Sequence, residues 1–197
     1  MAMTIRQKLM KLVYPLLVRA QQKSARKKIL VNRQGVVPSV LFHSLSVTLN
    51  NGQQMPFEVL RGKKVLLVNT ASNCGYTAQY AELQKLYEHT KDDLTIIAFP
   101  TNDFKAQEKG TDEDIAAFCS VNFGVQFPLA RKVVVAKTEE QHLVYQWLTS
   151  RQMNGWNEKL PSWNFAKYLV DEEGVLTHYF EPAVSPVDEE VIKAVQS

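Results

Sequence analysis

The sequence predicts an α/β fold in which helices cover both faces of a central β-sheet. Two observations carry this prediction. From residue 40 onward, short apolar runs typical of buried strands alternate with segments of helical periodicity. Near the end of the chain, two further strand-like runs flank a tight turn, which adds a hairpin to the sheet. The composition agrees, because 197 residues with 45% hydrophobic and 22% charged side chains suit one globular domain and exclude a disordered or fibrous chain.

The first half of this domain is expected to hold an opening hairpin, two buried strands and the helix between them. Asn50, Asn51 and Gly52 form a turn able to supply positive backbone φ angles, which favours a hairpin around them. The expected elements are strands at 46–49, 55–58 and 64–69, a helix at 81–89 and a strand at 94–99.

In the second half, Thr111 followed by three acidic residues is typical of a helix start, and the helix is expected to run through Phe118 and Cys119. The remaining expected elements are a strand at 132–136, a helix at about 139–151, strands at 165–170 and 175–180 joined by a turn at 171–174, and a helix from 186. A thioredoxin-like topology, with a central mixed sheet flanked by helices and an N-terminal hairpin, is the simplest arrangement of this order.

The N-terminal segment differs from the rest of the chain in charge. The first acidic residue is Glu58, although the net charge is only +3. Nine cationic side chains precede it: Arg6, Lys8, Lys11, Arg19, Lys23, Arg26, Lys27, Lys28 and Arg33. This asymmetry predicts a basic amphipathic extension at residues 1–39 ahead of a folded domain at 40–197.

Two interpretations of this extension stay open. Six apolar side chains fall on one helical stripe: Ile5, Leu9, Leu12, Val13, Leu16 and Leu17. Such a helix, through residues 1–35, fits an anionic membrane surface; the alternative is a segment that packs on the domain or is partly disordered, with Pro15 breaking any long helix. The apolar run is too short to span a bilayer, and Arg19 with the cations after it makes a weak signal peptide. We therefore expect a cytoplasmic protein with membrane association as an option, and disfavour secretion or a periplasmic location.

Cys74 is the first candidate for chemistry. It follows a predicted strand and precedes a predicted helix, where backbone N–H groups and the helix dipole favour thiolate over thiol. Thr77 stands where a thioredoxin-type reductase has its second cysteine, so exchange through a CxxC motif is excluded. The alternative is a buried structural cysteine. Two cysteines make no disulfide scaffold and lack zinc-site spacing, so we expect no metal and no bound cofactor.

Five blocks of the sequence resemble, in order, those of glutathione peroxidases. They are VNTASNCGYT at 68–77, FPTNDF at 99–104, AQEKG at 106–110, FP at 127–128 and SWNF at 162–165. The resemblance covers 40–197 and is to the Cys-containing, thioredoxin-dependent, bacterial type of the family. It implies a thioredoxin fold, an antioxidant peroxidase activity in the response to oxidative stress, and a peroxidatic site made of Cys74, Gln107, Trp163 and Asn164.

These residue types suit the implied reaction. A thiolate at Cys74 attacks the O–O bond of hydrogen peroxide or of an organic or lipid hydroperoxide, releases water or an alcohol, and becomes a sulfenic acid. The side-chain amides of Gln107 and Asn164 and the indole N–H of Trp163 are neutral donors for the sulfur and the peroxide.

The resemblance also implies that Cys119 resolves the sulfenic acid, because Cys-type members have a resolving cysteine in a helix shortly before the Phe-Pro block. A Cys74–Cys119 disulfide would then be reduced by thioredoxin, or by glutathione. Since a disulfide needs Cα atoms within about 7 Å, the helix holding Cys119 is expected to unwind locally. The alternative for Cys119 is an apolar helix residue.

Departures from the family pattern leave the four site residues intact. Many relatives carry a cysteine and a glutamine where this chain has Thr101 and Asp103, and a glycine and a proline where it has Ala106 and Lys109. The absent cysteine leaves Cys119 as the resolving candidate. Residues 135–163 lack the longer loop of tetrameric members, which favours a monomer.

Three functional classes remain: a hydroperoxide-reducing enzyme, a peroxide-sensing redox relay that uses the same cysteine pair, and a binding module without turnover. The four intact site residues favour the enzyme. We expect hydroperoxide as substrate and thioredoxin as partner, and no nucleic acid.

Overall fold

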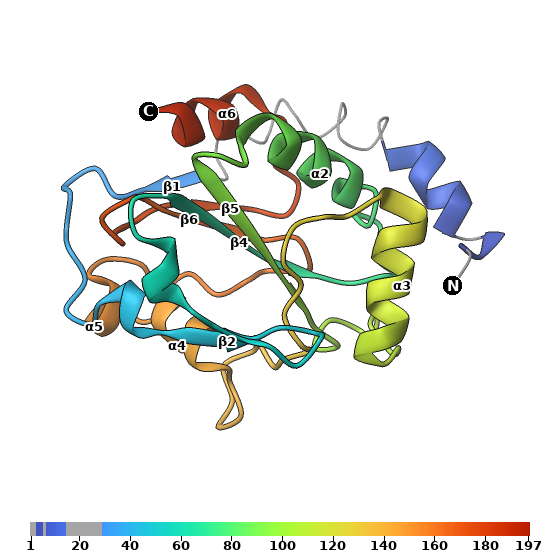
Figure 1. The fold of residues 1–197 in the computed structure, drawn as a ribbon, viewed down its shortest axis with the longest axis horizontal. Coiled ribbons are helices and arrows are strands. Elements are labelled where there is room, and N and C mark those ends of the chain that lie inside the picture. Colours follow the sequence, from blue (N-terminus) through green and yellow to red (C-terminus); the bar gives the residue numbers. More distant parts are fainter. Residues whose placement is uncertain (1–2, 6, 15–28) are drawn as a thin grey trace.

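The structure is a computed structural model that describes residues 3–5, 7–14 and 29–197. Its centre is a five-stranded mixed sheet with the order β1-β7-β6-β4-β5 (Figure 1). The strands are β1 Ile29–Val31, β4 Lys64–Thr70, β5 Leu94–Pro100, β6 Lys167–Val170 and β7 Leu176–Phe180. β4 and β5 are parallel, and the other neighbouring pairs are antiparallel.

Strand β4 is buried along its whole length and separates two apolar clusters. Leu66 and Val68 face the first cluster, whereas Val65 and Leu67 face the second, as the two-residue period of a strand requires. The first face is covered by α2 Gln79–Thr90, α3 Asp112–Phe123 and α6 Glu189–Gln196. The second is covered by α4 Leu143–Leu148, by the short helices η2 Phe42–Ser44 and η3 Phe57–Leu60, and by a hairpin of β2 Ser46–Thr48 and β3 Gln54–Pro56.

Most expected elements are confirmed. The hairpin turns at Gly52, whose φ of 86° is the positive value that the turn sequence predicts. Thr111 caps α3 in a reciprocal capping box with Asp114, and Gly124 ends that helix in the left-handed conformation. β6 and β7 pair across the predicted turn.

Two expectations in the second half are wrong. Residues 132–136 form no strand, because the N–H groups of Val135 and Ala136 donate to Asp103 Oδ2 at 2.6 and 2.8 Å instead of to a neighbouring strand. The helix expected at 139–151 is replaced by α4 and the short α5 Arg151–Asn154. The His142 side chain caps the start of α4, and Thr149 and Ser150 separate the two helices.

The structure also contains an element that the sequence did not predict. Residues 29–31 of the predicted extension form β1 and pair with β7, Ile29 opposite Phe180. A three-residue strand inside a basic segment shows too little alternation to be recognised. The boundary between residues 39 and 40 stays a prediction.

The N-terminal helix, helical at residues 7–14, lies against the domain beside α3 (Figure 1). It packs with the face opposite to most of the predicted apolar stripe, although Val13 of that stripe is half-buried. Its inner face includes Tyr14, whose hydroxyl donates to Glu82 of α2 at 2.9 Å. On the outer face, Ile5, Leu9 and Leu12 are 87%, 58% and 75% exposed. The last two members of the stripe, Leu16 and Leu17, lie outside the described residues. Among the helices that are described, none has both the length and the apolar character to cross a membrane.

Asp103 offers a test of the irregular segment that replaces the expected strand. We expect Asp103→Ala to lower the free energy of unfolding by about 1–2 kcal/mol, because two backbone N–H groups lose a charged acceptor. Asp103→Asn keeps one acceptor oxygen and should lose less. Urea unfolding monitored by tryptophan fluorescence measures both. Equal stability of Asp103→Ala and wild type would contradict this account.

Candidate active site

The first part of the site is the turn that carries Cys74 between β4 and α2. The Thr77 hydroxyl closes this turn: it accepts a hydrogen bond from the Cys74 N–H at 2.9 Å and lies 2.9 Å from the Ala71 carbonyl. The residue that replaces the second cysteine of a CxxC motif therefore holds the first cysteine in place. Only 4% of Cys74 is exposed.

The second part is the segment before β6 that carries Trp163 and Asn164. The Asn69 amide donates to the Trp163 carbonyl at 2.9 Å, and the Asn69 carbonyl accepts from the Phe165 N–H at 2.5 Å. Phe165 has a φ of 70°, an unfavourable left-handed value for a bulky residue that these bonds help to maintain. This cross-tie places Trp163 and Asn164 at the end of β4, next to the turn of Cys74.

A buried lysine supports the same segment. The Lys167 ammonium donates to the Phe165 carbonyl at 2.6 Å and to the Gln79 side-chain oxygen at 2.8 Å. Burial lowers the pKa of Lys167 to about 7, since no carboxylate bonds to it directly and only the more distant Glu82 and Glu181 favour its charge. Lys167 thus links α2 to the strand that follows the site.

The third part is the loop that carries Gln107. Lys105 and Ala106 adopt φ values of 53° and 49°, so two successive residues lie in the left-handed region. Ala106 therefore stands at a position that favours glycine. The loop is held by a bond from the Asn73 N–H to the Gln107 carbonyl at 3.1 Å.

The structure brings all four predicted site residues together. The Asn164 amide donates to the Gln107 side-chain oxygen at 3.0 Å, and the side chains of Trp163 and Asn164 lie near enough to the Cys74 thiol to favour its ionised form. The Tyr76 N–H also points to the Cys74 sulfur, at 3.4 Å. Packing with Phe104, with ring centroids 5.5 Å apart, orients the Trp163 indole.

The electrostatics of Cys74 differ from the sequence-based expectation. Burial raises the pKa of the Cys74 thiol, and the Tyr76 N–H, the Trp163 and Asn164 side chains and the Gly75 N–H offset only part of this effect. A lowered pKa was expected from a helix N-terminus, but α2 begins five residues later, at Gln79.

Part of the cover over Cys74 comes from the N-terminal helix. The Gln7 amide donates to the Ser72 carbonyl at 2.8 Å, and the methyl group of Met10 lies 3.2 Å from where a β-carbon on Gly75 would stand. Lys11 places its ammonium 4.7 Å from the centre of the Phe123 ring, at the end of α3. The helix therefore bridges the turn of Cys74 and the helix of Cys119.

Cys119 is fully buried inside α3, in the same apolar cluster as Cys74, and both thiols are free. Burial raises the pKa of Cys119 to about 12; the nearby Tyr80 hydroxyl opposes this shift and the negative charge of Glu108 adds to it. In this arrangement Cys119 is a protonated thiol enclosed by the protein. Its resolving role stays a prediction.

Sequence reasoning did not single out Glu108 as a residue of the site. It is only 2% exposed and accepts hydrogen bonds from the Ser72 N–H at 2.8 Å and the Ser72 hydroxyl at 3.0 Å. Burial raises the pKa of Glu108 to about 7. Its only signal in the sequence is its place next to Gln107. Within the described part of the chain, no three His, Cys, Asp or Glu side chains gather closely enough to hold a metal ion.

Solved structures establish the class of fold. A thiol:disulfide interchange protein of the thioredoxin family from Chlorobium tepidum superposes with a TM-score of 0.58 at 13% identity, covering 82% of this chain and 97% of that one, a likeness of fold alone. The crystal structure of T. cruzi GPX1 superposes with a TM-score of 0.58 at 28% identity, covering 78% and 92% of the two chains. The predicted thioredoxin-like α/β fold is confirmed.

Sequence comparison identifies the family. The family model described as glutathione peroxidase matches residues 42–149. The glutathione peroxidase homolog BsaA of Halalkalibacterium halodurans is 44% identical over 146 residues, which cover 74% of this chain and 92% of that protein. The glutathione peroxidase-like peroxiredoxin HYR1 of Saccharomyces cerevisiae is 42% identical over 161 residues, 79% of this chain and 98% of that protein. The chain belongs to the glutathione peroxidase family, as its sequence blocks suggested, and is a peroxidase of the glutathione peroxidase-like thiol type.

The raised pKa of Glu108 leads to a stability prediction. A carboxyl group whose pKa lies higher in the folded than in the unfolded chain stabilises the fold below about pH 4.5, and this contribution is lost as the pH rises through 7. Glu108→Gln cannot ionise. Relative to wild type, its free energy of unfolding should therefore increase between pH 5 and pH 8 by up to about 3 kcal/mol.

Urea unfolding at the two pH values measures this difference. Glu173→Gln is the matched control, because Glu173 is exposed and should show no comparable change. If the gap between Glu108→Gln and wild type is the same at both pH values, Glu108 is already ionised in the folded protein at pH 5.

Proposed function

We propose that the protein reduces hydrogen peroxide and organic or lipid hydroperoxides to water or alcohols through a sulfenic acid at Cys74. The observation that supports this most is the convergence of three donors on the Cys74 sulfur: the Tyr76 N–H and the side chains of Trp163 and Asn164. Neutral donors stabilise a thiolate without a bulky counter-ion in front of it.

In the proposed step, the Cys74 thiolate attacks one peroxide oxygen and the O–O bond breaks. The sulfur keeps that oxygen as sulfenic acid, and the other oxygen leaves as water or an alcohol after taking up a proton. Asn164 Oδ1 is buried without a hydrogen-bond partner among the described residues, so it can accept the peroxide O–H. Gln107 uses its oxygen to bind Asn164, which leaves its NH₂ group to donate to the departing oxygen.

Recycling is proposed to use Cys119. Its thiol attacks the sulfenic acid, a Cys74–Cys119 disulfide forms and water leaves. Thioredoxin, or alternatively glutathione, then reduces the disulfide to two thiols. Because Cys119 is fully buried within the hydrogen-bonded helix α3, this step requires local unwinding of that helix.

The resolving role is tested with Cys119→Ser. We expect this variant to oxidise once at Cys74, leaving a sulfenic acid that dimedone traps, and to lose thioredoxin-driven NADPH consumption. Ser120→Ala, which changes the exposed neighbouring residue, is the control and should cycle like wild type. Thioredoxin-driven cycling of Cys119→Ser at the wild-type rate would rule out the resolving role. A disulfide that forms in wild type without turnover on either reductant would favour the redox relay.

We further propose a monomer located in the cytoplasm. Two unpaired cysteines suit a reducing compartment, and the shortness of residues 135–163 supports the monomer.

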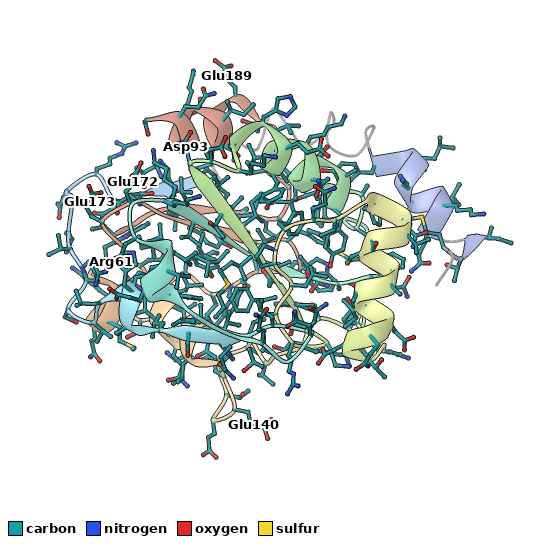
Figure 2. The ribbon with its side chains drawn as sticks, in the orientation of Figure 1. Arg61, Asp93, Glu140, Glu172, Glu173 and Glu189 are labelled. Atoms are coloured by element: carbon teal, nitrogen blue, oxygen red, sulfur yellow. The ribbon has the colours of Figure 1, made fainter. Side chains whose placement is uncertain are left out.

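We also infer contact of residues 1–35 with an anionic membrane surface. The exposed side chains Ile5, Leu9 and Leu12 form an outward apolar face on a segment rich in cations. The acidic side chains labelled in Figure 2, on the turns around the sheet and on α6, lie away from the N-terminal helix. The carboxylate of Glu82 does lie beside this helix, but it accepts the Tyr14 hydroxyl on the inner face, so the outer face remains available to an anionic surface.

Vesicle co-sedimentation tests this contact. We expect Leu9→Gln/Leu12→Gln to weaken binding to phosphatidylcholine vesicles containing 30% phosphatidylglycerol by at least about tenfold. The reason is that burying one leucine side chain in the membrane contributes about 1.5–3 kcal/mol to the free energy of binding. Val121→Gln/Leu143→Gln is the control, since these residues are 71% and 64% exposed elsewhere on the domain. Equal vesicle binding by the two double variants would contradict the proposed membrane contact.

A further inference from the structure

A cavity of about 440 Å³ lies beside the site, between the N-terminal segment and α3. Thr4 and Gln7 line it on one side, Ala106 and Lys109 come from the loop of Gln107, and Ile115 and Phe118 come from α3. The volume is within the range of small-molecule binding sites. The family match begins at residue 42, so Thr4 and Gln7 belong to a part of the chain outside it.

A second and much smaller hollow, of about 40 Å³, is lined by Cys74 and Met10. Gln7, Asn73 and Gln107 line both hollows, so the two adjoin at these residues. One water molecule takes up about 30 Å³ of liquid, so the small hollow has room for little more than a peroxy group. An organic hydroperoxide that reacts at Cys74 therefore needs a second space for its carbon atoms.

The larger cavity has an apolar lining that suits those carbon atoms. Most of its surface is apolar, and Ile115 and Phe118 of the apolar cluster reach it. Three ionisable side chains also line it, one of them the buried carboxyl of Glu108 described above. The carboxylate of Asp114 accepts the Thr111 N–H in the capping box, whereas Lys109 is a cation. An apolar cavity with one cation at its margin suits an alkyl or fatty acyl chain that ends in a carboxylate.

Gln7 connects the N-terminal segment to this arrangement. Its side-chain oxygen accepts the Thr4 N–H at 2.7 Å, while its amide donates to the Ser72 carbonyl at 2.8 Å. Thr4 is thereby held opposite the loop of Gln107, and the N-terminal segment encloses the cavity from outside.

We propose that this cavity binds the organic group of an alkyl or fatty acyl hydroperoxide, and that residues Thr4 and Gln7 form its outer wall. The peroxy group then lies in the small hollow at Cys74. This inference depends on the proposed function for its reaction, but binding of the organic group does not require turnover. The N-terminal segment becomes a determinant of specificity for this chain.

Binding is tested first, without chemistry. In a full-length Cys74→Ser background, isothermal titration with linoleic acid, a non-reactive probe, should give saturable binding. Adding Thr4→Trp, which fills the cavity from the outer wall, should raise the dissociation constant at least tenfold. Ala106→Leu, which fills the cavity from the opposite wall, should also raise the dissociation constant. Val59→Trp, an exposed position on η3, is the matched control and should leave the constant unchanged.

Specificity is tested next, in the background with Cys74 intact. Thr4→Trp should lower the ratio of kcat/KM for linoleic acid hydroperoxide to kcat/KM for hydrogen peroxide at least tenfold, since hydrogen peroxide has no organic group. Circular dichroism of the variants verifies folding, and Ala106→Leu serves if Thr4→Trp does not fold.

The outcomes separate the two proposals. No saturable binding of linoleic acid, or equal dissociation constants with and without the filling substitutions, would overturn the binding site whatever the activity. Binding that Thr4→Trp weakens, in a protein whose wild type reduces no hydroperoxide, would support the site and reject the proposed reaction.

Discussion

Burial of the Cys74 sulfur is the constraint on which the rest of the site depends. A thiolate inside an apolar cluster is costly, and burial is the largest influence on this thiol, raising its pKa. Donors must therefore be brought to the sulfur from elsewhere in the fold. The Tyr76 N–H comes from the same turn, but Trp163 and Asn164 come from a segment about ninety positions later.

The hydrogen bonds between Asn69 and residues 163–165 bring these distant donors to the Cys74 turn. Asn69 lies near the end of the buried strand that leads to Cys74, and its side-chain NH₂ and its backbone carbonyl both bind the backbone of the distant segment. Lys167 adds a second tie through the Phe165 carbonyl, at the cost of a buried amine. The left-handed Phe165 shows that this geometry is imposed on the backbone by its surroundings. The positions of the donors are thus set by hydrogen bonds to the sheet.

Much of the fold could be predicted because its signals are local. The apolar runs of β4 and β5 and the Thr111–Asp114 capping box each act within a few residues. The prediction failed at 132–136, where the deciding contact is with Asp103, about thirty positions earlier. The four predicted site residues rest on family blocks rather than on spacing. The direction of the Cys74 pKa and the buried state of Glu108 depend on segments that meet only in the folded chain, so they could not be derived beforehand.

Because Cys119 is buried within the folded helix α3, the proposed disulfide chemistry depends on the local stability of that helix. A capping box fixes the start of this helix and Gly124 in the left-handed conformation fixes its end, while Cys119 lies fully buried between them. If Cys119 resolves the sulfenic acid, the rate of disulfide formation is proportional to the small fraction of molecules in which the helix is open. Selection for a firmer helix would then slow the catalytic cycle, whereas a looser helix would speed it and endanger the fold. In such a protein, the opening equilibrium of a single helix sets the working temperature range of the enzyme.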